Sequence, residues 1–174
     1  ICEGLVGSEM CIRDRFTTNI FQMSLLKVGD KIPEFSCYDD KENLITNKDL
    51  EGKKTIIFFY PKANTPGCTA QACNLSENFS VLTKAGYSII GVSADKVKSQ
   101  SSFSSKFGGF PYPLLADTEK KIINSFGVWG FKKFMGKEYE GILRTTFVVD
   151  EKLTIIKVIE KVKTKDHSSQ ILEG

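Results

Sequence analysis

Thr55-Ile56-Ile57-Phe58-Phe59-Tyr60 is a continuous run of apolar and β-branched residues that ends at Pro61. Such a run is typical of a strand that is buried on both faces of a sheet. A second run of the same kind, Ser88-Ile89-Ile90-Gly91-Val92-Ser93, follows about 30 residues later. These two runs predict two neighbouring strands in the interior of the protein.

Between the two runs, Thr65-Pro66-Gly67 has the form of a helix start. Thr65 is a favourable N-cap, and proline is common at the first helical position. We expect the helix to continue to about Lys84, because Gly86 is a typical C-terminal stop. Residues 55–93 therefore predict a βαβ unit with parallel strands and a right-handed crossover.

The rest of the chain continues this alternation. Two strands, at 145–149 and 153–159, flank Asp150-Glu151-Lys152, which is a hairpin signal. A βαβ unit followed by a ββα unit is the thioredoxin arrangement, so we predict an α/β, thioredoxin-like fold with a central mixed β-sheet flanked by helices. The other expected elements are a strand-like segment at 34–38, helices at about 98–107, 119–125 and 165–172, a strand at 112–116, and a long loop at 126–143.

A length of 174 residues favours a single domain. Residues 1–22 differ from the rest, because they hold two of the five cysteines and two of the three arginines without a helix or strand period. We expect the native protein to begin at Met23, with residues 1–22 as a non-native extension and 23–174 as the domain. Cys2 and Cys11 would then have no function.

Charge and hydropathy exclude several classes of protein. The formal charge is only +3, and 24 basic residues are scattered among 21 acidic ones, whereas a nucleic-acid binder shows a clustered basic patch. No segment approaches the ~18 apolar residues of a transmembrane helix, and Glu3 and Glu9 interrupt what would be a secretory signal. We therefore expect a cytoplasmic protein in which most cysteines are reduced and any disulfide is catalytic.

Cys68 falls in the first turn of the predicted helix. The first N–H groups of a helix have no intrahelical partner and carry the positive end of the helix dipole. Helix N-termini are therefore among the places where a thiol becomes a reactive thiolate, the form that attacks a peroxide oxygen. This position makes Cys68 the candidate nucleophile.

Attack on a peroxide breaks the O–O bond and leaves negative charge on the departing oxygen, which needs fixed hydrogen-bond donors. The candidates are the N–H groups of Gly67 and Cys68, the Thr65 hydroxyl and the guanidinium of Arg144, while Pro61 would narrow the turn and help to exclude water. Arg144 is the only arginine after residue 23. Either its position needs a planar, permanently charged group, or the arginine stands there by chance in a lysine-rich chain.

A second thiol is needed to condense with the sulfenic acid that forms on Cys68, and Cys73 is the nearest candidate. Five residues of helix place two Cα atoms ~8.6 Å apart, whereas a disulfide tolerates up to ~7 Å. Either the first turns of the helix unwind after oxidation, or Cys73 is not the partner.

The remaining cysteine and histidine residues have simpler interpretations. We expect Cys37 to be a core residue and His167 to lie on the surface. The chain has no cysteine and histidine spacing of the kind that holds zinc, and nothing marks His167 as the base of a cysteine protease. A thioredoxin-type oxidoreductase would need a Cys-X-X-Cys pair, which is absent.

The segment Pro61-x₃-Thr65-x₂-Cys68 resembles the peroxidatic motif of peroxiredoxins, and Cys73 matches the resolving cysteine of the Q-type, or bacterioferritin comigratory, subfamily. The resemblance covers about residues 24–173. It includes 27–35, Gly91-Val92-Ser93-x-Asp95, 110–117, 133–137 and Gly141-Ile142-x-Arg144-x-Thr146-Phe147.

This resemblance implies a thiol peroxidase that reduces hydrogen peroxide and organic hydroperoxides and is recycled by thioredoxin or a similar dithiol. By motif position, Cys68 would be peroxidatic, with Thr65 and Arg144 shaping its site and Pro61 and Gly67 beside the substrate. Cys73 would close an intramolecular disulfide through local unfolding, in a monomer or weak dimer. The resemblance implies no metal and no organic cofactor, and from the charge and hydropathy described above we expect no nucleic-acid or membrane partner.

The chain departs from the family pattern at three positions. Gln71 stands where the family usually has glutamate, Ser76 where many relatives have arginine, and Gln100 where many have histidine. Loss of the carboxylate at position 71 removes a negative charge near the predicted site. A redox sensor or an oxidation-activated holdase would use the same cysteines, and only turnover with peroxide and a reductant separates these roles from an enzyme.

Overall fold

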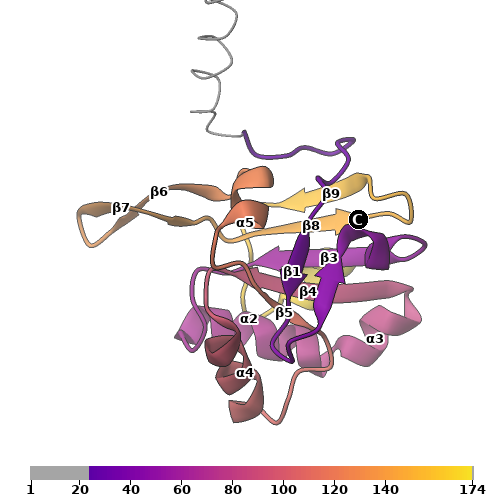
Figure 1. Ribbon diagram of the computed structural model, residues 1–174, viewed down its shortest axis with the longest axis horizontal. Helices are drawn as coiled ribbons and strands as arrows, with labels where there is room; N and C mark the ends of the chain where they lie inside the picture. The colour runs from indigo at the N-terminus through magenta and orange to yellow at the C-terminus, as the bar shows by residue number, and fades with distance from the viewer. Residues whose placement is uncertain (1–23, 174) are drawn as a thin grey trace, which may run out of the picture.

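A five-stranded mixed sheet forms the centre of the molecule (Figure 1), for which a computed structural model describes residues 24–173. Its strand order is β5-β4-β3-β8-β9. Strands β3 (Lys54–Phe59), β4 (Tyr87–Ser93) and β5 (Leu114–Ala116) are parallel, whereas β8 (Thr145–Val149) and β9 (Ile155–Ile159) are antiparallel to their neighbours. The predicted βαβ and ββα units are both present.

Two helices, not one, connect β3 to β4. Helix α2 spans Pro66–Glu77 and α3 spans Phe79–Lys84, with a break at Asn78, where φ is −96° and ψ is 10°. The Asn74 carbonyl accepts hydrogen bonds from both the side chain and the backbone N–H of Asn78, at 2.9 and 3.2 Å. Asparagine forms such local side-chain bonds readily, which makes it unfavourable inside a helix. The prediction of one continuous helix was therefore wrong at this residue, whereas the stop near Gly86, with φ at 88°, was correct.

Helices cover both faces of the sheet, as the fold class requires. One apolar cluster contains Leu50 of the 3-10 helix η2 (Asn47–Leu50) together with Ile122 and Ile123 of α5 (Lys121–Ser125). The other contains side chains of α2, α3, α4 (Val97–Lys106) and α6 (His167–Leu172). No helix within residues 24–173 is both long and apolar enough to cross a membrane.

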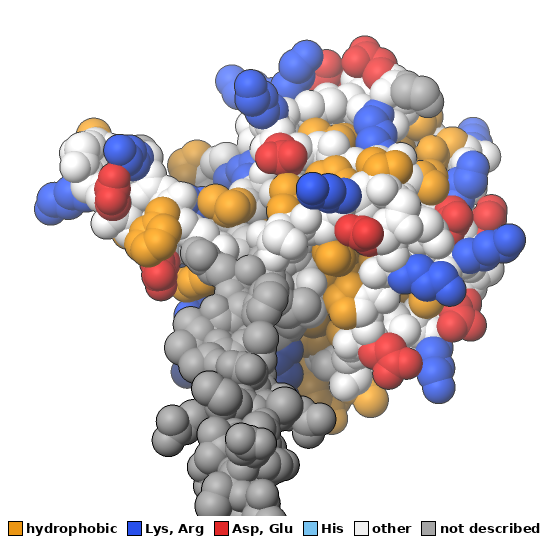
Figure 2. Space-filling view, turned by 90° about the horizontal axis from the view of Figure 1, so that it is seen from above, with side chains coloured by type: hydrophobic (Ala, Val, Ile, Leu, Met, Phe, Trp, Pro, Cys, Tyr) orange, Lys and Arg blue, Asp and Glu red, His pale blue; other side chains and the backbone are white. Residues whose placement is uncertain are grey.

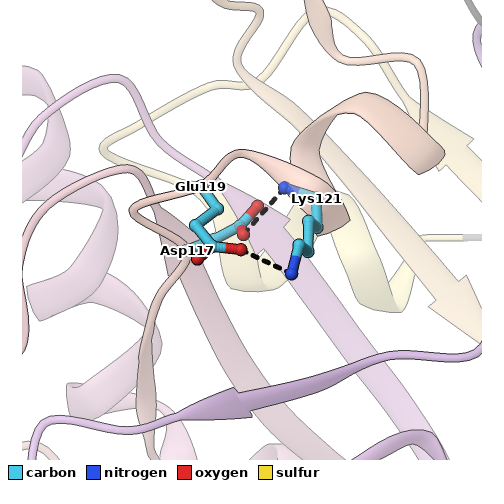
Figure 3. Close-up of polar contacts among 3 residues, drawn as sticks. All are labelled: Asp117, Glu119 and Lys121. Carbon is cyan, nitrogen blue, oxygen red and sulfur yellow. Dashed lines mark hydrogen bonds and ion pairs between the residues drawn. The ribbon is translucent and has the colours of Figure 1, made fainter.

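A buried carboxylate fixes the start of α5 (Figure 3). Asp117 is 4 % exposed and accepts hydrogen bonds from the backbone N–H groups of Lys121 and Ile123 at 2.9 and 2.8 Å. Burial raises its pKa despite these donors. Lys121 also pairs with Glu119 on the surface. Because α5 is held in this way, the segment that follows it leaves the body of the protein at a defined point.

That segment is a β-hairpin, so the prediction of a long loop at 126–143 was wrong. Strands β6 (Trp129–Phe134) and β7 (Lys137–Ile142) pair antiparallel and project from the body (Figure 1). Met135 and Gly136 form the turn, both with positive φ. The segment is rich in glycine, lysine and aromatic residues, which suggested a loop. A strand is usually recognised by alternating apolar and polar residues, but a two-stranded arm exposed on both faces does not need that alternation. A second small hairpin joins β1 (Ser36–Tyr38) to β2 (Leu44–Thr46).

His167 contradicts its predicted surface position, since it is 0 % exposed. Its Nε2 atom lies 2.8 Å from the Thr146 hydroxyl of β8, and its Nδ1 atom lies 3.3 Å from Gln170 Oε1. Helix α6 packs on α2, and this turns the first residue of α6 inward. A helix as short as α6 shows no repeat of apolar residues in the sequence, so the sequence did not indicate which of its residues are buried. The predicted status of residues 1–22 lies outside the described residues.

Charged side chains of both signs are spread between apolar ones on the face seen in Figure 2. They do not form a single basic patch on that face, in agreement with the small net charge. The distribution of charge on this face therefore does not mark a functional surface, and the functional site depends on specific contacts between residues.

Candidate active site

Cys68 is the third residue of α2 and is 1 % exposed. The first backbone bond of this helix runs from the Thr69 N–H to the Thr65 carbonyl at 2.9 Å. The N–H groups of Gly67 and Cys68 precede that bond and have no acceptor within the helix. The structure therefore places the thiol in the first turn, as predicted, beside two backbone donors.

Arg144 is the residue that directly contacts this thiol. Its Nη2 atom lies 3.3 Å from Cys68 Sγ, and its Nη1 atom donates to Gln71 Oε1 at 2.7 Å. Sheet register explains the meeting, because Thr145 pairs with Phe59 at the end of β3, just before the loop that leads to α2. The sheet thus brings Arg144, one of the candidate donors, into contact with Cys68.

Gly67 permits this close approach of Arg144. A Cβ atom at residue 67 would lie 3.1 Å from Arg144 Nη2, which is tighter than ordinary contact. A larger side chain would push the guanidinium away from the thiol. Gly67 thus shapes the site through the absence of a side chain, in addition to its backbone N–H.

Thr65 occupies the predicted N-cap position but does not cap the helix through its side chain. Its hydroxyl donates to the Lys62 carbonyl at 2.8 Å, so the proton is directed into the preceding loop and not toward the thiol. Asn64, between them, has a φ of 61°, which closes this turn in the left-handed region. Pro61 begins the loop directly after Tyr60 and is half-buried.

Cys73 lies in the same intact helix, five residues after Cys68, and is half-buried. Helix geometry keeps their Cα atoms ~8.6 Å apart, so the two cannot bond in this conformation. Both thiols are free. Partial burial, followed by the nearby Glu77 carboxylate, raises the pKa of Cys73.

A buried hydrogen-bond network that the sequence did not reveal supports the loop before Cys68. The Tyr60 hydroxyl donates to Gln100, whose amide donates to Ser93 Oγ at 2.8 Å. The Ser93 hydroxyl donates to Asp95 at 2.8 Å, and the same Asp95 oxygen accepts from the Ala63 N–H at 2.8 Å. The sequence offered two related observations, the family resemblance at 91–95 and the departure from the family pattern at Gln100. Neither indicated that these residues join Tyr60 in one hydrogen-bond network.

Lys132 was also missed, because the segment that carries it was predicted to be a loop. It belongs to β6 and is half-buried. Burial lowers its pKa, the Arg144 cation lowers it further, and Cys68 opposes both effects. The projecting hairpin thus brings a second cation near the thiol.

Cys37 takes no part in this arrangement. Cys37 is buried in the core as expected, and burial together with the Asp117 carboxylate raises its pKa to about 11. Among residues 24–173 there is no group of three or more histidine, cysteine or acidic side chains that could hold a metal ion. What the site offers is a buried thiol, a guanidinium fork and two free backbone donors, which together suit nucleophilic attack with stabilisation of an oxyanion.

Comparison with known proteins agrees with this chemistry. Residues 28–158 match the AhpC/TSA family. Peroxiredoxin Bcp of Escherichia coli is 41% identical over 150 residues, covering 86% of this chain and 96% of the relative.

Two solved structures share the fold. The bacterioferritin comigratory protein of Xanthomonas campestris, described for its alkyl peroxide reduction activity, superposes with a TM-score of 0.74 at 33% identity over 79% of this chain and 87% of its own. A cysteine-to-serine mutant of Xylella fastidiosa PrxQ gives a TM-score of 0.79 at 27% identity, covering 86% and 94% of the two chains. The predicted thioredoxin-like fold is confirmed.

Proposed function

Because the chain belongs to the AhpC/TSA family of peroxiredoxins, which are thiol-dependent peroxidases, we propose that it reduces hydrogen peroxide and organic hydroperoxides with Cys68 as nucleophile. The observation that carries this assignment is the 3.3 Å contact between Arg144 Nη2 and Cys68 Sγ at the start of α2. The Xanthomonas relative, which reduces alkyl peroxides, supports the same class of substrate.

In the first step, the Cys68 thiolate attacks the terminal oxygen of the hydroperoxide. The S–O bond forms as the O–O bond breaks, so that Cys68 becomes a sulfenic acid and the rest of the substrate leaves as an alkoxide that takes up a proton. Arg144 and the N–H groups of Gly67 and Cys68 donate hydrogen bonds to the oxygens on which charge develops. Pro61 and Thr65 shape the loop that holds the substrate against these donors.

In the second step, the Cys73 thiol attacks the sulfenic sulfur of Cys68, and water leaves as the disulfide forms. This step requires that the first turns of α2 unwind, since the intact helix separates the two Cα atoms by ~8.6 Å. Helix ends are regions of low local stability. The intact part of α2 remains tied to α6 and to the segment before it, because the Asn74 side chain donates to the Lys165 carbonyl at 3.0 Å and accepts from the Ser168 N–H at 2.9 Å.

The disulfide is then reduced by an external dithiol, for which thioredoxin is the proposed donor. Cys73 is half-buried in the reduced protein, and unwinding would expose it further. An intramolecular bond needs only one chain, so the cycle operates in a monomer. The cytoplasm, where dithiol systems keep cysteines reduced, is the compartment that suits this chemistry.

One equivalent of hydrogen peroxide, added to the fully reduced chain, tests this cycle. We expect a mass loss of two hydrogens, with peptide mapping that places the new bond between Cys68 and Cys73. The Cys73→Ser variant should instead stop with one added oxygen at Cys68, and the Cys37→Ala control should still form the disulfide. Oxygen retained at Cys68 in the wild-type chain would remove Cys73 from the cycle, and no rapid change at Cys68 would overturn the proposed function.

Turnover provides the second part of the test. With thioredoxin, thioredoxin reductase and a nicotinamide cofactor, the wild-type chain should consume many equivalents of hydroperoxide. A single equivalent followed by a stall would contradict recycling by thioredoxin.

A further inference from the structure

Gln71 lies one helical turn after Cys68 and contacts the same arginine. Residues three apart in a helix share a face, and the Arg144 fork bridges the two, with Nη1 on Gln71 Oε1 at 2.7 Å and Nη2 on Cys68 Sγ at 3.3 Å. Gln71 is 0 % exposed. The geometry of the nucleophile and the guanidinium therefore depends on a fully buried neutral side chain.

The orientation of the Gln71 amide follows from its partner. A guanidinium has only donors, so the atom that faces Arg144 must be the amide oxygen. The other end, Nε2, is then a buried donor, and it is the one buried side-chain polar atom without a hydrogen-bond partner in residues 24–173. A buried unpartnered donor is costly, and here it adds partial positive charge to the side of the helix that carries Cys68.

No carboxylate neutralises Arg144 within the described part of the chain, where the ion pairs are Lys121–Glu119 and Lys133–Glu138. The other titratable groups that act on the site are Lys132 of β6, Tyr60 next to β3 and His167 of α6. Burial raises the pKa of Tyr60 and lowers that of His167 to about 4, so both are neutral at pH 7. Arg144 therefore faces Cys68 Sγ at 3.3 Å without a carboxylate paired to it.

We propose that Gln71 is a positioning residue that holds the Arg144 guanidinium against Cys68 without neutralising it, so that the full positive charge acts on the thiolate and on the leaving oxygen. A glutamate at residue 71 would hold Arg144 at least as firmly, through a charge-assisted bond. It would also place a negative charge one turn from the thiolate. This inference rests on the proposed function of Cys68 as the peroxidatic residue.

The variants Gln71→Glu and Gln71→Met separate two effects of residue 71: whether it holds the Arg144 guanidinium in place, and whether it neutralises the charge of that guanidinium. The measured quantity is the pH at which Cys68 reaches half of its maximal alkylation rate, with peptide mapping to select Cys68. We expect Gln71→Glu to raise this pH by about one unit, because a nearby like charge disfavours the thiolate. Below both midpoints, its rate with hydrogen peroxide should then be about tenfold lower than that of the wild-type chain.

Gln71→Met has a similar length and adds no charge. We expect its midpoint to stay within about 0.3 pH unit of the wild type, because thiolate and guanidinium still attract one another, while its peroxide rate falls as Arg144 loses its anchor. Circular dichroism should show that both variants fold. An unshifted Gln71→Glu midpoint would overturn the inference, and so would an equal upward shift in both variants. Absence of any reaction at Cys68 in the wild-type chain would instead overturn the proposed function.

Discussion

Arg144 Nη2 lies 3.3 Å from Cys68 Sγ, although 76 residues separate them in the sequence. The β8–β3 register produces this contact, because Thr145 pairs with Phe59 at the end of the strand that leads into the Cys68 loop. The fork uses both of its terminal nitrogens, one on the thiol and one on Gln71. A point charge at the same position could not make both bonds in the same geometry.

We therefore expect Arg144→Lys to lower the second-order rate constant with hydrogen peroxide by about 10²-fold, which is the typical loss when one donor to a developing oxyanion is removed. Stopped-flow kinetics on the reduced chain measure this constant. Lys133→Ala, which removes an exposed cation of the β6–β7 hairpin, is the control and should leave the rate within about twofold. A lysine variant as fast as the wild type would show that charge alone is sufficient.

Asp95 supports the loop before Cys68, because one of its oxygens accepts from the Ala63 N–H and from the Ser93 hydroxyl, both at 2.8 Å. We expect Asp95→Ala to lower the free energy of unfolding by about 1–3 kcal/mol, since it leaves the Ala63 N–H without its partner. The peroxide rate constant should fall as well. Urea unfolding provides the measurement. Glu119→Ala removes a carboxylate from an exposed pair and should change stability by less than about 0.5 kcal/mol.

Long-range strand pairing was predictable from the sequence because continuous apolar runs leave few alternatives to a buried strand. The run at 55–60 and the hairpin signal at 150–152 both correspond to observed strands and turns. The β6–β7 hairpin was not predictable in the same way, because both of its faces contact water over much of its length and its residues show no apolar alternation. Asn78 interrupts the predicted helix, because its φ of −96° and ψ of 10° depart from helical values.

The site was predictable where local chemistry defines it and hidden where distant contacts define it. A cysteine after Thr-Pro-Gly at a helix start indicates a reactive thiol from the sequence alone. The burial of His167 and the approach of Lys132 both depend on packing between separate elements. No local pattern records such contacts.

Tyr112 restrains the helix that must unwind for Cys68 and Cys73 to meet. Its buried hydroxyl donates to the Ala72 carbonyl, next to Cys73, at 2.7 Å. We expect Tyr112→Phe to lose about 1 kcal/mol of stability and to form the Cys68–Cys73 disulfide several-fold faster, as measured by rapid quenching and mass spectrometry. Tyr139→Phe, on the exposed hairpin, is the matched control and should change neither quantity. Lost stability with an unchanged rate would mean that this bond persists during unwinding.

His167 makes stability depend on pH. Burial lowers its pKa from 6.5 to about 4, and the hydrogen bond with Gln170 opposes this shift only in part. The unfolded chain therefore binds a proton between these two values while the folded chain does not. The contribution to stability is fully present above about pH 6.5 and is lost as the pH falls toward 4, by about 3 kcal/mol in total.

Because acidic residues also titrate in this range, the test compares urea unfolding of the wild type with that of His167→Gln between pH 7 and pH 4. We expect the variant to be less stable at pH 7, since the contact with Thr146 changes, but to lose less stability on acidification. Parallel pH profiles for the two proteins would contradict a neutral, buried His167.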